Sequence, residues 1–159
     1  MTELVTMHAK DALRGSAGKA FIILDGQRYF FAQLKNIKAT DTKNKTKIGI
    51  LGKTGKGNKS NGVEGTATAT FYFNTSIFRK IMLKYRQTGE DIYFDTQITN
   101  EDATSSVGRQ TTILKDCNLD STIMAYLDVD ADVLEEDISF TYEDVDMPEE
   151  FNILAEMQA

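Results

Sequence analysis

The sequence has no tryptophan and, among its 159 residues, only one cysteine, one proline and one histidine. The lone Cys117 excludes an internal disulfide and a cysteine-based zinc cluster, and we expect a small buried hydrophobe there. The lone His8 excludes Ser-His-Asp and Cys-His catalysis and the usual histidine metal sites. Since no pair of carboxylates stands out by an apolar setting, we expect no catalytic centre, no metal and no cofactor.

Long apolar runs and linkers are missing as well. No segment is apolar enough to span a bilayer, and the N-terminus lacks the pattern of a signal peptide, so we expect no membrane anchor and a chain made in a reducing cytoplasm. The only proline, Pro148, lies near the C-terminus, and 41% of the residues are hydrophobic. These features predict one compact domain over residues 1–159, with a mobile N-terminal arm of about residues 1–18.

The charges divide sharply along the chain, although the formal net charge is only −6. Residues 1–90 hold sixteen basic and six acidic residues, whereas residues 91–159 hold two basic and eighteen acidic ones. Most charged runs are simply solvated surfaces. A division this clean nevertheless allows copies of the chain to attract one another head to tail, and such contacts produce rings or filaments.

The clearest local signal is a β-hairpin. Residues 20–24 and 27–34 are rich in β-branched and aromatic residues, and they flank Asp25-Gly26, a two-residue turn. Residues 66–73 alternate strictly, which predicts a strand with one buried face. Further strands are expected at residues 47–51, 91–99, 109–117, 121–130 and 137–145.

One amphipathic helix is expected over residues 76–88, ended by Gly89. Its apolar arc consists of Ile77, Phe78, Ile81, Met82 and Tyr85, and its opposite, basic face consists of Arg79, Lys80, Lys84 and Arg86. The helix must therefore lie on a sheet and show a basic outer surface. Antiparallel strands with a single helix predict an α+β fold, mainly antiparallel β, arranged as a β-sandwich or barrel-like domain with one flanking α-helix.

The Gly/Lys-rich stretch of residues 49–62 resembles a nucleotide-binding loop only superficially. Gly52 and Gly57 have the right spacing, but Asn58 stands where the lysine should be, and a strand follows in place of a helix. We instead expect a long inter-strand loop over about residues 52–65, and long loops are often functional. Its lysines complement the acidic half of another copy.

An acidic segment at residues 128–133 imitates the opening of a calcium loop. The EF-hand requires Gly at its sixth position and Glu at its twelfth, where this chain has Val133 and Ser139. We therefore expect no structural calcium site. A small cytoplasmic β-domain that binds a ligand or calcium remains an alternative function, and a hydrolase that uses carboxylates is another.

Long collinear segments of the chain resemble a known family. Residues 52–78, "GKTGKGNKSNGVEGTATATFYFNTSIF", residues 83–98, "LKYRQTGEDIYFDTQI", and residues 127–151, "LDVDADVLEEDISFTYEDVDMPEEF", are similar to tail tube (core tail) proteins of contractile-tailed phages and phage-like particles, of the PBSX type. The earlier segment "GSAGKAFIILDG" also resembles the start of that family. The resemblance covers nearly the whole chain in order.

This resemblance implies a structural, non-enzymatic subunit. Its copies would form hexameric rings that stack into a hollow tube inside the sheath, a conduit for DNA ejection or for membrane puncture. The implied partners are the sheath, a baseplate or tube initiator, a tail terminator and a tape-measure protein, and DNA would pass through without specific binding. The protein would belong to the virion tail, or to a phage-like particle such as a contractile bacteriocin, after assembly in the host cytoplasm.

The resemblance also suggests roles for two sets of residues. The ring-stacking loop would comprise Gly52, Lys53, Gly55, Lys56, Gly57, Lys59, Gly62 and Gly65. The acidic set, which would line the channel or receive the loop, comprises Asp128, Asp130, Asp132, Glu135 and Glu136. An acidic channel would repel DNA phosphates.

Overall fold

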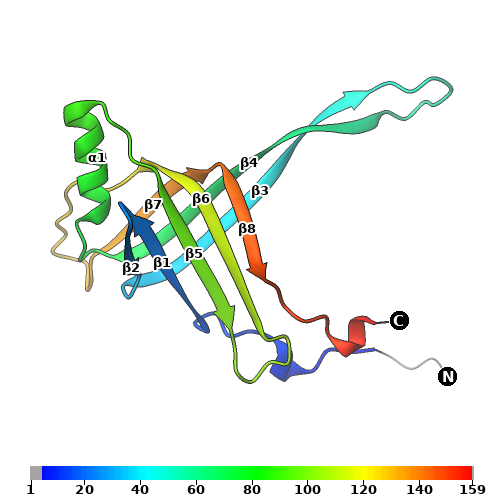
Figure 1. Cartoon of the computed structure of the whole chain (residues 1–159), viewed down its shortest axis with the longest axis horizontal. Helices are drawn as coiled ribbons and strands as arrows, with labels where there is room; N and C mark the ends of the chain where they lie inside the picture. The colour runs from blue at the N-terminus through cyan, green and yellow to red at the C-terminus, as the bar shows by residue number, and fades with distance from the viewer. Residues whose placement is uncertain (1–4, 159) are drawn as a thin grey trace. The chain divides into compact units, whose positions relative to one another are not determined.

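The computed structural model describes residues 5–158. As the sequence predicts, this part of the chain is mainly antiparallel β, with eight strands and one α-helix. The strands and the helix, labelled in Figure 1, are β1 (Gly18–Leu24), β2 (Gln27–Phe30), β3 (Leu34–Ile48), β4 (Gly57–Tyr72), α1 (Ile77–Thr88), β5 (Phe94–Glu101), β6 (Arg109–Ser121), β7 (Glu135–Tyr142) and β8 (Asp144–Glu149). Two short 3-10 helices, η1 (Ala9–Asp11) and η2 (Ala155–Met157), lie near the two ends.

The chain forms two compact units. Unit 1 contains the residues up to Ala32, residues 94–115 and the residues from Val145 onward. Unit 2 contains residues 33–93 and 116–144. Strand β6 runs from the first unit into the second, since its residues fall on both sides of the boundary at Lys115 and Asp116.

In unit 1 the strand order is β2-β1-β5-β6, and β8 also pairs with β6. The predicted hairpin is confirmed, because Asp25 and Gly26 join β1 and β2 with φ angles of 51° and 75°. Phe21 and Ile22 are fully buried in β1, and the Phe21 ring meets Phe30 edge-on at 5.6 Å. Gly18 opens β1, where a Cβ atom would overlap the carbonyl oxygen of Thr99 on β5.

In unit 2 the order is β6-β7-β4-β3, all antiparallel. The alternation predicted for residues 66–73 is confirmed, since Ala67, Ala69 and Phe71 are buried. They pair with Phe140, Ile138 and Glu136 of β7, so alternate residues of both strands form the core.

Helix α1 covers this core face of unit 2. Phe78 and Ile81 are buried, and the Phe78 ring lies 5.0 Å from that of Phe71. Gly89 caps the helix in the left-handed conformation at φ 75°, as expected. Two details of the predicted helix differ, because Tyr85 is half exposed and Arg79 points inward, as described below.

Three other expectations from the sequence are wrong. The strand expected at residues 47–51 is the end of the 15-residue strand β3, which stops at Ile48 and includes the polar run before it. Residues 57–64 of the predicted loop belong to β4, where they pair with β3. Residues 122–134, expected to be mostly strand, contain no strand, and Leu127 and Val129 of their predicted apolar face are 96% and 95% exposed.

Candidate functional site

The most distinctive feature of unit 2 is a two-stranded ribbon that extends beyond the rest of its sheet (Figure 1). Strand β7 pairs with β4 only between Gly65 and Tyr72, whereas β3 pairs with β4 as far as Gly57. We call residues 41–64 the distal hairpin. Side chains reinforce its ladder, because Asn61 Nδ2 donates to Thr46 Oγ1 at 2.8 Å. The segment that the sequence identified as a loop is thus mainly an ordered hairpin.

A tyrosine fixes the root of this hairpin. Asp41, Gly65 and Tyr142 lie opposite one another on β3, β4 and β7. The Tyr142 hydroxyl donates to Asp41 Oδ1 at 2.6 Å, and its ring lies so close to Gly65 that an added Cβ would be 2.6 Å from Cδ2. Burial, followed by the bond to Asp41, raises the pKa of Tyr142 well above its ordinary value, so the hydroxyl remains a donor at any working pH.

The predicted stacking residues lie along the distal hairpin and its tip. Lys53 is in the tip, where its amide donates to Ile50 O at 3.1 Å beside Gly52 at φ 82°. The hairpin carries six lysines, and its only two acids, Asp41 and Glu64, lie at the root. The remaining residues are distributed as follows: Gly55 and Lys56 in the tip, Gly57, Lys59 and Gly62 on β4, and Gly65 at the root.

The exposed apolar side chains of the hairpin cluster at its end. Leu51 is fully exposed, and Ile48 and Ile50 expose 43% and 39% of their surface. Val63 is also exposed, but it pairs with Lys43 near the root. A ribbon that shows both lysines and bare aliphatic groups is suited to contact a protein surface that is acidic and apolar.

The structure separates the predicted acidic set into two groups. Asp128, Asp130 and Asp132 are exposed in the β6–β7 connection, which we define as residues 122–134. Glu135 is paired with Lys35 at 2.6 Å. Glu136 differs from the expectation of an exposed acid, because it is 1% exposed and its Oε2 lies 2.7 Å from Arg79 Nη1.

Arg79 is consequently a structural residue of unit 2. Besides Glu136, it donates to Ile123 O at 2.9 Å, and its guanidinium lies 4.3 Å from the centre of the Phe73 ring. The helical periodicity placed Arg79 on the outer face of the helix, because it gives only the direction in which a side chain leaves the backbone. The long side chain of Arg79 instead folds back between the helix and the sheet.

The face of the unit 2 sheet opposite the helix is bare and rich in hydroxyl groups. Eleven residues of β3, β4 and β7 share it by register, and six of them are Ser or Thr: Asn36, Lys38, Thr40, Thr66, Thr68, Thr70, Tyr72, Glu135, Asp137, Ser139 and Thr141. Its charged residues are Lys38, Asp137 and Glu135, and Glu135 is neutralised by its ion pair with Lys35. With Ser121, the central residues line a shallow hollow of about 410 Å³. This face offers polar groups but almost no net charge.

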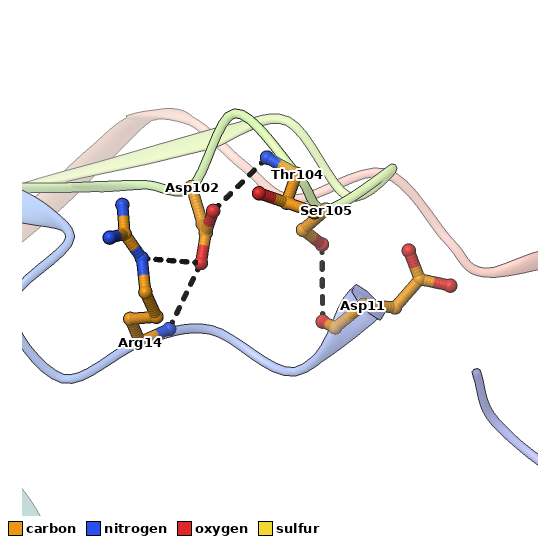
Figure 2. Close-up of polar contacts among 5 residues, drawn as sticks. All are labelled: Asp11, Arg14, Asp102, Thr104 and Ser105. Atoms are coloured by element: carbon orange, nitrogen blue, oxygen red, sulfur yellow. Dashed lines mark hydrogen bonds and ion pairs between the residues drawn. The ribbon is translucent and has the colours of Figure 1, made fainter. Parts of the chain in front are cut away.

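Unit 1 contains a polar cluster that the sequence did not reveal (Figure 2). Asp102 is 3% exposed and accepts from the amides of Arg14 and Thr104 at 3.1 and 3.0 Å. Asp11, also buried, accepts from the amide and hydroxyl of Ser106 at 2.9 and 2.7 Å. The predicted mobile arm is therefore bonded to the β5–β6 loop at Asp11 and Arg14, while its residues 1–4 lie outside the described residues.

Acid is expected to release this N-terminal segment. The Ser106 amide and hydroxyl lower the pKa of Asp11, and the Arg14 and Thr104 amides lower that of Asp102. Stability from such carboxylates is present above their ordinary pKa of about 4 and is lost as the pH falls through the folded values. NMR signals of the Arg14, Thr104 and Ser106 amides should therefore shift together below about pH 4.

Asp102→Asn provides the control for this titration. It should remove the acid transition at Arg14 and Thr104 while leaving that at Ser106, which reports on Asp11. Signals that stay constant down to pH 2 would show that the two carboxylates do not hold the segment.

The described residues contain neither a metal site nor a membrane helix. Between residues 5 and 158, no group of three or more His, Cys, Asp or Glu side chains is placed to hold a metal ion. No helix in this part of the chain is long and apolar enough to cross a membrane. Cys117 is buried, as expected for a small core residue.

Comparison with known proteins gives a consistent result. Residues 5–149 match the family described as "Phage tail tube protein". The phage-like element PBSX protein XkdM of Bacillus subtilis (strain 168) is 39% identical over 148 residues, which is 93% of this chain and 98% of XkdM. The sequence resemblance to the PBSX type is therefore confirmed.

Solved structures share the fold at low sequence identity. The SPP1 tail tube matches with a TM-score of 0.62 at 12% identity, over 89% of this chain and 81% of that one. A chain of the sheath–tube complex of an extracellular contractile injection system, PVC in its extended state, matches with a TM-score of 0.59 at 10% identity, over 81% and 87% of the two chains. These likenesses support the mainly antiparallel fold.

Proposed function

The chain belongs to the phage tail tube protein family, and from that membership we propose that its copies form hexameric rings that stack into a hollow tube. The family is structural and non-enzymatic, and the chain is a tail tube component of a phage or phage-like contractile system. The tube serves as a conduit for DNA ejection or for membrane puncture.

One observation carries the proposal: the two faces of the unit 2 sheet are entirely different. Helix α1 and the aromatic core cover one face, whereas the other is bare and lined by hydroxyl groups. The wall of a channel that conducts DNA must be hydrated, which requires polar side chains. It must also not bind the DNA phosphates, which requires that basic residues do not outnumber acidic ones. Six Ser and Thr residues, with one lysine, one aspartate and a glutamate paired with Lys35, meet that requirement, so this face lines the channel.

The same arrangement assigns the outside of the tube. Helix α1 lies on the outer wall, where its remaining basic residues are available to a sheath protein with an acidic inner surface. Baseplate, terminator and tape-measure proteins meet the tube at its ends or within its channel, and assembly takes place in the host cytoplasm. These partners follow from the family and from the sheath–tube complex in which a protein of this fold is found.

Electron microscopy and size-selective labelling test the proposal together. Negative-stain images of the purified protein over a concentration series should show rings and hollow tubes. Thr68→Cys then reports on the bare face, and Lys80→Cys on α1 is the control. Native Cys117 is buried and contributes no background.

Each site should react with a small maleimide in both rings and tubes. A maleimide attached to a long polyethylene glycol chain should label Lys80→Cys in tubes but react at least tenfold more slowly with Thr68→Cys, because it must enter through the tube ends. Equal rates at the two positions would place the hydroxyl face outside and contradict the channel assignment.

A further inference from the structure

A bulge in the distal hairpin places an Asn-Gly pair where the ladder is interrupted. The register shifts between Asn44, which pairs with Gly62, and Lys45, which pairs with Ser60. Asn61 therefore has no partner on β3 and is the extra residue of the bulge. Both Asn61 and Gly62 are exposed. Of the eight asparagines in the chain, only Asn61 is followed by glycine, so the sequence and the bulge single out the same residue.

An asparagine in this setting can react with its own backbone. The amide nitrogen of Gly62, once deprotonated, attacks Cγ of Asn61, and Nδ2 leaves as ammonia to give a cyclic succinimide. Water then opens this ring at either of its two carbonyl groups, which yields an aspartate or an isoaspartate at position 61. Because glycine has no Cβ, its nitrogen can approach the side-chain carbon without steric obstruction.

The surroundings of Asn61 favour this attack. Residues 45–60, beyond the bulge, hold five lysines and no acid, and nearby positive charge stabilises the deprotonated form of the Gly62 amide. The interrupted ladder also leaves the local backbone freer to bring nitrogen and carbon together. Asn61 Nδ2 donates to Thr46 Oγ1 at 2.8 Å, but this bond is exposed and water competes for both groups.

We propose that Asn61 is a self-modification site, which the chain converts to aspartate and isoaspartate through a succinimide formed with Gly62. The reaction requires only water, which reaches this exposed pair directly, and no second protein. It therefore proceeds in the isolated chain and does not depend on ring or tube formation. The extent of modification at position 61 records the time since the chain was made.

Either product changes the part of the hairpin beyond the bulge. An aspartate places a negative charge beside the five lysines of residues 45–60 and can no longer donate a hydrogen bond to Thr46. An isoaspartate also adds one methylene group to the main chain of β4, which displaces the pairing of residues 57–60 with residues 45–48. Modification should therefore loosen the end of the hairpin.

Peptide mass spectrometry of the folded chain, incubated at neutral and mildly alkaline pH, tests the site. Asn61 should lose its amide at least tenfold faster than Asn58, an exposed asparagine of the same hairpin that is followed by Lys59. The rate should rise with pH, because the attacking nitrogen must lose its proton. An isoaspartate methyltransferase should then label position 61. Circular dichroism verifies that the chain stays folded during the incubation.

Two results would overturn the proposal. One is a rate at Asn61 no higher than that at Asn58. The other is conversion to aspartate without any isoaspartate, because direct hydrolysis of the side-chain amide yields aspartate alone. Asn61→Gln is the matched control, since it keeps a side-chain amide but must close a larger, more slowly formed ring, and it should remain unmodified.

Trypsin measures the structural consequence, because lysines lie on both strands beyond the bulge. After incubation the wild-type chain should be cut after Lys45 and Lys59 at least threefold faster than before, whereas Asn61→Gln, incubated equally long, should be cut at its starting rate. Equal cutting of fresh and fully modified wild-type chains would show that the pairing beyond the bulge does not depend on position 61.

Discussion

Arg79→Ala is expected to destabilise the folded chain by about 3–5 kcal/mol, because it leaves a buried carboxylate without its partner. Glu136 is 1% exposed, and its Oε2 lies 2.7 Å from the guanidinium of Arg79. The substitution also removes the bond to Ile123 O, which anchors the β6–β7 connection. Urea unfolding followed by circular dichroism measures the loss as a lower midpoint at an unchanged slope.

Three further variants identify the cause of this loss. Lys80→Ala, an exposed neighbour on α1, should change stability by no more than about 0.5 kcal/mol. Glu136→Gln should cost less than Arg79→Ala, since a neutral amide remains hydrogen-bonded to Arg79 without a buried charge. A double change to Arg79→Met and Glu136→Leu should recover most of the stability, because an apolar pair of similar volume can replace a buried ion pair.

Additive losses of stability in the Arg79 and Glu136 variants would contradict the coupling of these two side chains. If Arg79→Ala costs the same in the wild type and in a Glu136→Leu background, the two side chains are not energetically coupled, and the burial of Glu136 has another compensation. If Arg79→Ala prevents folding altogether, Arg79→Lys gives the measurement, because it retains the positive charge beside Glu136 and loses the planar guanidinium over Phe73.

The sequence predicted those elements whose signals are local. The Asp25-Gly26 turn, the alternation of Ala67, Ala69 and Phe71, and the Gly89 cap each depend on a few neighbouring residues, and all three are confirmed. Cys117 as a core residue belongs to the same group. Periodicity and turn chemistry are sufficient here because the conformation of a turn or cap, and the choice of the inward face of a strand, are set by residues next to one another in the chain.

The distal hairpin was missed because neither of its faces is buried. Residues 41–48 and 57–64 are polar on both sides, so their strands have no alternation and resemble a loop. Cross-strand pairing alone gives no pattern that a single sequence can reveal. The opposite error occurred at residues 121–130, where alternating aliphatic and acidic residues resemble a half-buried strand but belong largely to an exposed connection.

Contacts between residues far apart in the sequence limit how much of the candidate site can be predicted. Asp11 and Ser106, or Arg14 and Asp102, are separated by most of the chain, and nothing near each residue indicates its partner. The same applies to Gly65, which the sequence placed in the ring-stacking loop. The structure gives another reason for that glycine, since the ring of Tyr142 occupies the space that a side chain would need.

Gly65→Ala should therefore have the second large effect, a loss of about 2.5–6 kcal/mol. Its Cβ would lie 2.6 Å from Cδ2 and Cζ of Tyr142, so the ring must move and the core repack, at about 1–3 kcal/mol. Movement of the ring also breaks the 2.6 Å hydrogen bond to Asp41, and a bond to a charged group contributes about 1.5–3 kcal/mol. Urea unfolding measures the total.

Gly55→Ala in the hairpin tip is the matched control, because an added Cβ meets nothing there within 4 Å. In a Tyr142→Leu background, Gly65→Ala should cost less than half of its wild-type effect, since the clashing ring is absent. An equal cost in both backgrounds would mean that the backbone conformation at Gly65, and not the Tyr142 ring, requires a glycine there.

Because Asp41, Gly65 and Tyr142 join the distal hairpin to the sheet, the Gly65→Ala chain should also fail to form tubes at concentrations where its rings still form. A folded Gly65→Ala chain that stacks normally would show that the direction of the hairpin does not depend on this root.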